Sequence, residues 1–220
     1  MAMFGSEQLT VHFPDSAEMP EGTWHFKLRA LIYDFLVLAF GEIATIGSEQ
    51  FVYWDPTNPQ VCLSPDAFVY FGAKNEHFRS WKVWERGVPQ VAVEVISGSE
   101  SELGWDEKLE RYLQLGVSEL VWFDPETSEH PLRIWDLVDG ELRERGLLQP
   151  SAQSRHLGGY WLPVAEAGGL TLRLSRDEHG RTLFPTAAEH HADARRAAEA
   201  ALSAAEQRIA ELQAELNRKG

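Results

Sequence analysis

The feature that most restricts the fold is an apolar run at residues 90–97, followed by a helix-like segment and a second apolar run. The first run, QVAVEVIS, is rich in β-branched residues, which favour strands. After a Ser-Gly-Ser break, residues 103–115 have a helical pattern that ends at Gly116, and residues 118–123 again have the composition of a strand. Strand, helix and strand joined by short links predict a βαβ unit, and therefore an α/β fold.

The flanking sequence adds a helix and several short strands. Residues 20–40 predict an amphipathic helix that ends at Gly41. Its apolar side is formed by Leu28, Leu31, Ile32, Phe35, Leu36 and Leu38. Strand-like runs lie at residues 42–46, 50–54, 61–63, 66–71 and 132–138, whereas residues 80–86 have no clear period. We expect further short strands and loops over residues 142–184, which carry no chemical signature.

The composition changes at Ala187, after which neither Gly nor Pro occurs before Gly220. Apolar residues recur there at spacings of four and three, at Ala198, Leu202, Ala205, Ile209, Leu212 and Leu216. This repeat is typical of a coiled coil. We therefore expect one domain over residues 1–186 and a C-terminal helix over residues 187–220 that forms a homodimer. A surface helix packed on its own domain is the alternative.

The charge balance is strongly acidic, with 34 acidic and 20 basic residues and a formal net charge of −14. Six acidic and five basic residues follow Ala187, so the excess belongs to the domain. Such a field repels phosphate, which argues against a general basic surface for nucleic acid and predicts weak, salt-sensitive engagement. The single cysteine, Cys62, excludes an intramolecular disulfide and a multi-cysteine metal site.

The N-terminal residues contain no basic segment followed by an apolar stretch, so they do not have the pattern of a signal peptide. The longest apolar run, residues 30–40, is interrupted by Asp34 and is shorter than the roughly 20 residues of a membrane span. These patterns predict a soluble, cytoplasmic protein with no membrane partner.

Two acidic residues, Asp66 and Glu94, lie on predicted strands and are candidates for a functional site. In VAVEVIS, strand alternation puts Glu94 on the same face as Ala92 and Ile96, where a charge is unfavourable unless it is paired or bound to metal. Asp66 follows Pro65 and begins an apolar strand. The alternatives are a salt-bridged core glutamate or an edge-strand carboxylate for Glu94, and ordinary turn chemistry for Asp66.

One lysine lies on the helix that follows Glu94. Helical geometry puts Lys108 beside the apolar stripe of Leu109 and Tyr112, so its side chain could point back over the sheet. The alternative is a lysine whose ammonium group is simply solvated.

The segments SPDAFVYFG, PQVAVEVIS and DEKLERYLQLGVSELVWFDP together resemble the Uma2 family, over roughly residues 21–136. That family comprises restriction-endonuclease-like proteins of the PD-(D/E)XK nuclease superfamily. The resemblance implies an α/β fold with a restriction-endonuclease-like core, in which helices flank a mixed β-sheet, and a C-terminal helix or coiled coil. It also implies a metal-dependent endonuclease whose substrate is DNA rather than RNA.

The same resemblance implies the residues of the site. Asp66, Glu94 and the backbone carbonyl of Val95 would hold Mg²⁺ or Mn²⁺, and Lys108 would stabilise the attacking water or the transition state. Glu21 or His25 could reach the metal from the first helix. We interpret these two residues rather as a helix-start carboxylate and an ordinary surface histidine.

The sequence departs from the family pattern at one position. The usual E-x-K lysine would stand two residues after Glu94, where this chain has Ile96. Lys108 is the candidate replacement, and Lys82 is a weaker one. If neither replaces it, the chain is a catalytically inactive nuclease-fold module that assembles through its coil.

Overall fold

The structure is a computed structural model that describes residues 22–96, 102–127, 129–147 and 149–219. The chain divides between Phe184 and Pro185 into two compact units. None of the helices in the described ranges is both long enough and apolar enough to cross a membrane.

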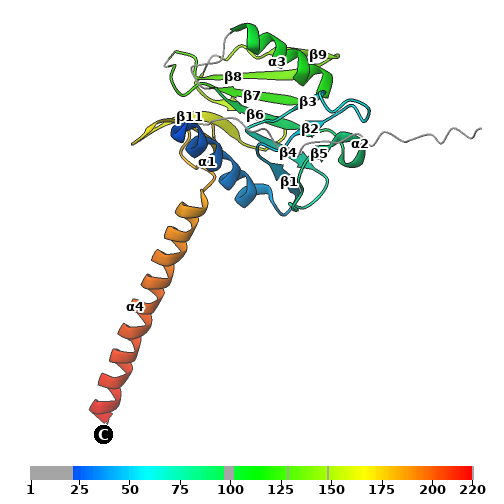
Figure 1. Cartoon of the computed structure of the whole chain (residues 1–220). Helices are drawn as coiled ribbons and strands as arrows, with labels where there is room; N and C mark the ends of the chain where they lie inside the picture. Colours follow the sequence, from blue (N-terminus) through cyan, green and yellow to red (C-terminus); the bar gives the residue numbers. More distant parts are fainter. Residues whose placement is uncertain (1–21, 97–101, 128, 148, 220) are drawn as a thin grey trace, which may run out of the picture. The chain divides into compact units, whose positions relative to one another are not determined.

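A mixed six-stranded sheet forms the centre of the first unit (Figure 1). Its strand order is β1-β4-β6-β7-β8-β9. The strands are β1 (Ala44–Gly47), β4 (Ala67–Phe71), β6 (Val91–Val95), β7 (Glu119–Phe123), β8 (Leu132–Val138) and β9 (Glu141–Glu144). The β6–β7 pair is parallel and the other neighbours are antiparallel. Helix α3 (Glu102–Leu115) joins β6 to β7, so the predicted βαβ unit and the α/β class are confirmed.

Each face of this sheet is covered by one helix and one small sheet. The first face packs against α1 (Thr23–Phe40) and against β10 (Ala152–Gln153), β11 (Tyr160–Glu166) and β12 (Gly169–Ser175). The second face packs against α3 and against β2 (Val52–Tyr53), β3 (Cys62–Leu63) and β5 (Trp81–Lys82), which leads into the short helix α2 (Val83–Arg86). Two apolar cores therefore enclose the sheet.

The alternation predicted for β6 is confirmed. Val91, Val93 and Val95 belong to the core under α1, whereas Ala92 and Ile96 belong to the core under α3. Strand β6 lies between β4 and β7 in the interior of the sheet. The edge-strand interpretation of Glu94 is therefore wrong, and its carboxylate belongs to the face that α3 covers.

One detail of the first unit differs from the sequence prediction, and another gives form to the strands expected over residues 142–184. Leu38 is 40% exposed, so it does not belong to the apolar side of α1. Residues 160–175, which carry no clear signature, fold into the β11–β12 hairpin, with Glu166 opposite Gly169 across a two-residue turn. The hairpin buries Leu172 and Leu174 in the core under α1.

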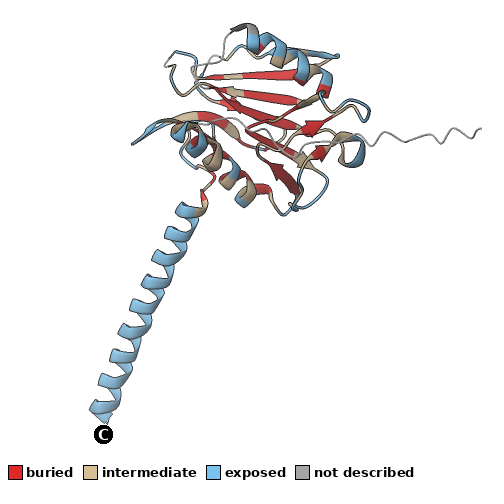
Figure 2. Ribbon diagram, in the orientation of Figure 1, coloured by how far each residue is buried: buried red, intermediate tan, exposed pale blue. Residues whose placement is uncertain are grey.

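The second unit is α4 (Ala187–Lys219), a helix of 33 residues. A reciprocal capping box begins it: the Glu189 amide donates to Thr186 Oγ1 at 3.2 Å, and the Thr186 amide donates to Glu189 Oε2 at 2.8 Å. None of its residues is buried in the chain, and Figure 2 shows it exposed along its length.

Candidate metal centre

Asp66 and Glu94 come together at one end of the central sheet. In the antiparallel β4–β6 pair, Ala67 lies opposite Val93, so one further step along the register brings Asp66 opposite Glu94. Asp66 is 7% exposed and Glu94 is 2% exposed. Two carboxylates that are 28 positions apart in the sequence are therefore neighbours on adjacent strands, and both are almost completely buried.

Helix α3 supplies two partners to the carboxylate of Glu94. Lys108 Nζ lies 2.8 Å from Glu94 Oε2, and the buried Tyr112 hydroxyl donates a hydrogen bond to Oε1. These two residues are one helical turn apart, so they point toward the sheet together. Lys108 therefore meets the strand carboxylate directly, and it is not a solvated surface lysine.

The electrostatics of this pair oppose ionisation of the glutamate. The pKa of Glu94 is raised to about 7. Burial is the main cause, and the nearby charge of Asp66 acts in the same direction, whereas Lys108 and the Tyr112 hydrogen bond oppose both effects. A buried carboxylate is unfavourable until a cation compensates its charge. The lysine compensates only part of the charge that Asp66 and Glu94 carry together.

The first turn of α1 places His25 against the other carboxylate. Asp66 Oδ2 accepts a 2.7 Å hydrogen bond from the Val95 amide and lies 3.3 Å from His25 Nε2. The same nitrogen lies 2.9 Å from the Val95 carbonyl oxygen. Because a carbonyl only accepts, Nε2 carries the hydrogen. His25 is therefore not an ordinary surface histidine, since it joins Asp66 to the carbonyl of Val95.

A loop next to β1 fixes the backbone of Asp66. Ser48 Oγ donates to the Asp66 carbonyl at 2.7 Å, and Arg29 from α1 donates to Ser48 Oγ at 3.2 Å. The amide of Glu49 donates to the Pro65 carbonyl at 2.9 Å, with Glu49 in the left-handed region at φ 65°. The carboxylate thus projects from a backbone that is held on both sides.

The donor set fits a hard divalent cation. Asp66, Glu94 and the Val95 carbonyl all offer oxygen, the ligand atom that Mg²⁺ and Mn²⁺ prefer. The charge of Asp66 opposes ionisation of Glu94, and a bound cation would relieve that repulsion. In the residues that the structure describes, no cluster of three or more His, Cys, Asp or Glu side chains could hold a metal ion. A cation here would rest on two carboxylates and a backbone carbonyl.

The remaining candidates lie elsewhere. Ile96, at the expected lysine position, is 7% exposed and packs in the core under α3. Lys82 Nζ lies 3.4 Å from Glu85 Oε1, its neighbour on α2. Glu21 lies outside the described residues.

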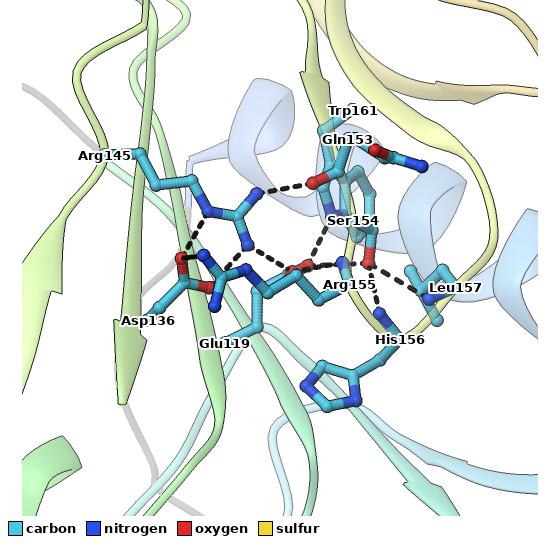
Figure 3. Close-up of polar contacts among 9 residues, drawn as sticks. All are labelled: Glu119, Asp136, Arg145, Gln153, Ser154, Arg155, His156, Leu157 and Trp161. Carbon is cyan, nitrogen blue, oxygen red and sulfur yellow. Dashed lines mark hydrogen bonds and ion pairs between the residues drawn. The ribbon is translucent and has the colours of Figure 1, made fainter. Parts of the chain in front are cut away.

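A second pair of buried carboxylates, not singled out from the sequence, lies on β7 and β8 at the opposite end of the central sheet. Figure 3 shows this pair and its partners. Glu119 on β7 is opposite Asp136 on β8, and the two are 0% and 3% exposed. Arg145 joins them, with Nη2 at 2.8 Å from Glu119 Oε2 and Nε at 2.6 Å from Asp136 Oδ2. Arg155 Nη2 lies 3.1 Å from Asp136 Oδ2.

Glu119 also binds the small sheet that covers this face. Its oxygens accept hydrogen bonds from Ser154 Oγ at 2.7 Å, from the Arg155 amide at 2.8 Å and from Trp161 Nε1 at 3.1 Å. These residues lie in or between β10 and β11 (Figure 3). Because arginines and neutral donors satisfy the carboxylates, this cluster is a structural tie between two sheets.

Comparison with known proteins adds the following. The family model described as "Uma2: Putative restriction endonuclease" matches residues 16–165, a range that includes both carboxylates, Lys108 and His25. A crystal structure described as "a putative nuclease belonging to DUF820", from Anabaena variabilis, is similar over 64% of this chain and 76% of its own, with 14% identity and a TM-score of 0.47. The search among curated proteins found no match.

Proposed function

Because the chain belongs to the Uma2 family of nuclease-like proteins, we propose that it is a divalent-metal-dependent endonuclease that hydrolyses phosphodiester bonds in DNA. One observation carries the proposal. Asp66 and Glu94 are buried at one end of the sheet, and Lys108 lies 2.8 Å from Glu94. Carboxylates that share a buried position with a lysine are the groups that metal-assisted phosphodiester hydrolysis uses.

Each residue has a distinct role in this proposal. Asp66, Glu94 and the Val95 carbonyl hold the metal, Mg²⁺ or Mn²⁺, which when bound would activate water and neutralise charge on the scissile phosphate. The Lys108 ammonium group, which is partly exposed, orients the attacking water or stabilises negative charge in the transition state. His25 is a positioning residue that keeps Asp66 and the Val95 carbonyl at a fixed separation.

The net charge of −14 limits how the substrate is held. The net field would repel a duplex, while the cation and Lys108 would attract its phosphates locally. We therefore expect weak, salt-sensitive substrate engagement that depends on metal. The exposed apolar seam of α4 further supports a homodimer formed through this helix.

The direct test is cleavage of supercoiled and linear DNA by the purified full chain with Mg²⁺, with Mn²⁺ and with excess chelator. RNA of matched sequence tests the preference for DNA. Calorimetric titration of each metal into wild type and Glu94→Ala tests the site itself. If wild type cuts neither nucleic acid with either metal, or if both proteins bind metal equally, the proposal fails.

Replacing Lys108 separates catalysis from metal binding. Lys108→Ala should reduce the cleavage rate by about 10²–10³-fold, because one preorganised donor to the developing charge is lost. Metal should still bind, since the oxygen donors remain. Lys82→Ala, at a lysine that lies 3.4 Å from Glu85 on α2, is the matched control and should cut at the wild-type rate. Cleavage by Lys108→Ala at the rate of Lys82→Ala and of wild type would remove Lys108 from the mechanism.

The raised pKa of Glu94 predicts how metal affinity depends on pH. Below about pH 7 this carboxyl is protonated in the metal-free protein, and it must lose that proton to bind a cation. Affinity should therefore increase as the pH rises from 5.5 to about 7 and then level off. Calorimetry in two buffers of different ionisation enthalpy should show proton release at pH 6 and almost none at pH 8. A pH-independent affinity would contradict this prediction.

A further inference from the structure

Helix α4 exposes an apolar seam along its C-terminal half. The exposed fractions are 61% for Leu202, 55% for Ile209, 48% for Leu212 and 74% for Leu216. No residue of this helix is buried in the chain. A helix that leaves aligned large aliphatic side chains in water gains stability when a second helix covers them.

The spacing assigns the seam to heptad positions. Leu202, Ile209 and Leu216 fall at position a, and Ala198, Ala205 and Leu212 at position d. Arg208 and Glu215 then occupy g positions, which flank the seam. The residues at positions a, d, e and g distinguish parallel from antiparallel pairing of two α4 helices.

A parallel pair matches these residues poorly. It would place Ala205 against the same residue of the second chain and leave a gap between layers of larger side chains. Arg208 at g would face the partner's Gln213 at e, so no ion pair would form across the seam. One heptad earlier, Arg195 at position a would face its own copy.

We propose that α4 pairs antiparallel with α4 of a second copy of this chain. Ile209 then faces the partner's Leu212, and Ala205 faces the partner's Leu216, so that small and large side chains alternate. Twofold symmetry brings Arg208 beside the partner's Glu215 at two places. The aliphatic stem of Lys219 covers the partner's Leu202.

This pairing deepens the homodimer proposed above and is independent of the nuclease chemistry, so its tests measure association and not cleavage. The contact spans residues 202–219 of each helix. Only four large aliphatic residues per chain lie in it, so the contact belongs to the small class of interfaces. We expect dissociation at about micromolar concentration.

Disulfide cross-linking tests the orientation. In a Cys62→Ala background, mixed Leu202→Cys and Lys219→Cys chains should form a cross-linked dimer under mild oxidation, whereas each variant alone should form far less. Antiparallel pairing places the two copies of position 202 about 26 Å apart along the axis, beyond disulfide reach. Gln207→Cys, on the outer face, is the matched control in place of Leu202→Cys. Efficient self-linking of Leu202→Cys would establish a parallel pair and overturn the proposal.

Charge reversal provides an independent test. Arg208→Glu should weaken the dimer about tenfold, because it brings like charges together at two places. The double variant Arg208→Glu/Glu215→Arg should restore the wild-type value, as measured by sedimentation equilibrium of the full chain. A double variant as weak as the single one, or a wild type that stays monomeric at 100 μM (about 100 times the expected dissociation constant), would overturn the pairing while leaving the proposed endonuclease untouched.

Discussion

Glu94→Gln should reduce metal-dependent cleavage by about 10³-fold or more, while the protein stays folded. The amide keeps the size of the side chain and can still accept from Tyr112. It removes the negative charge that would hold the cation, and bound metal contributes several kcal/mol to transition-state stabilisation. Cleavage rates under single-turnover conditions, with the melting temperature of each variant, measure both effects.

Asp66→Asn should lose a similar factor, because it removes the second charged ligand. Glu107→Gln is the matched control, since this exposed residue lies on α3 next to Lys108. It should cut at the wild-type rate. Cleavage by Glu94→Gln within tenfold of wild type would show that the metal, if used, is held elsewhere.

Glu119→Ala should reduce the free energy of unfolding by about 3–5 kcal/mol. The substitution leaves Arg145 with a single carboxylate and removes the acceptor for Ser154 Oγ and Trp161 Nε1. Buried donors that lose their acceptor bear the full loss of solvation. Urea denaturation followed by fluorescence measures the change, because Trp161 lies within the cluster.

The control for this loss is Glu141→Gln, at a surface pair with Arg143 on β9. An exposed ion pair contributes about 1 kcal/mol at most, so this variant should unfold almost as wild type does. A loss below about 1 kcal/mol for Glu119→Ala would mean that the cluster does not tie the two sheets together.

The sequence was most informative where periodicity and burial agree. Alternation in β6 separated the valines from Glu94, and helical spacing put Lys108 on the border of the apolar stripe of α3. Once β6 and α3 are packed against each other, the 2.8 Å contact between these residues follows. The α/β class and the βαβ unit were predictable for the same reason.

The sequence was least informative where partners come from distant segments. Glu119 begins a strand and could equally have faced water, and its partners lie up to 42 positions later on elements that have little periodicity. Its position on the same face as Val121 was the one available signal. His25 is similar, because only the packing of α1 on the sheet brings it within 2.9 Å of the Val95 carbonyl.

Laboratory selection for thermostability should act against the buried carboxylate of Glu94. Its raised pKa means that its charge weakens the folded state at neutral pH, so a neutral residue that still accepts from Tyr112 and Lys108, such as glutamine, should stabilise the fold. A library screened only for thermostability would therefore lose this residue early and return well-behaved proteins without a catalyst. Any search for stabler variants of this chain must carry an activity screen from its first round.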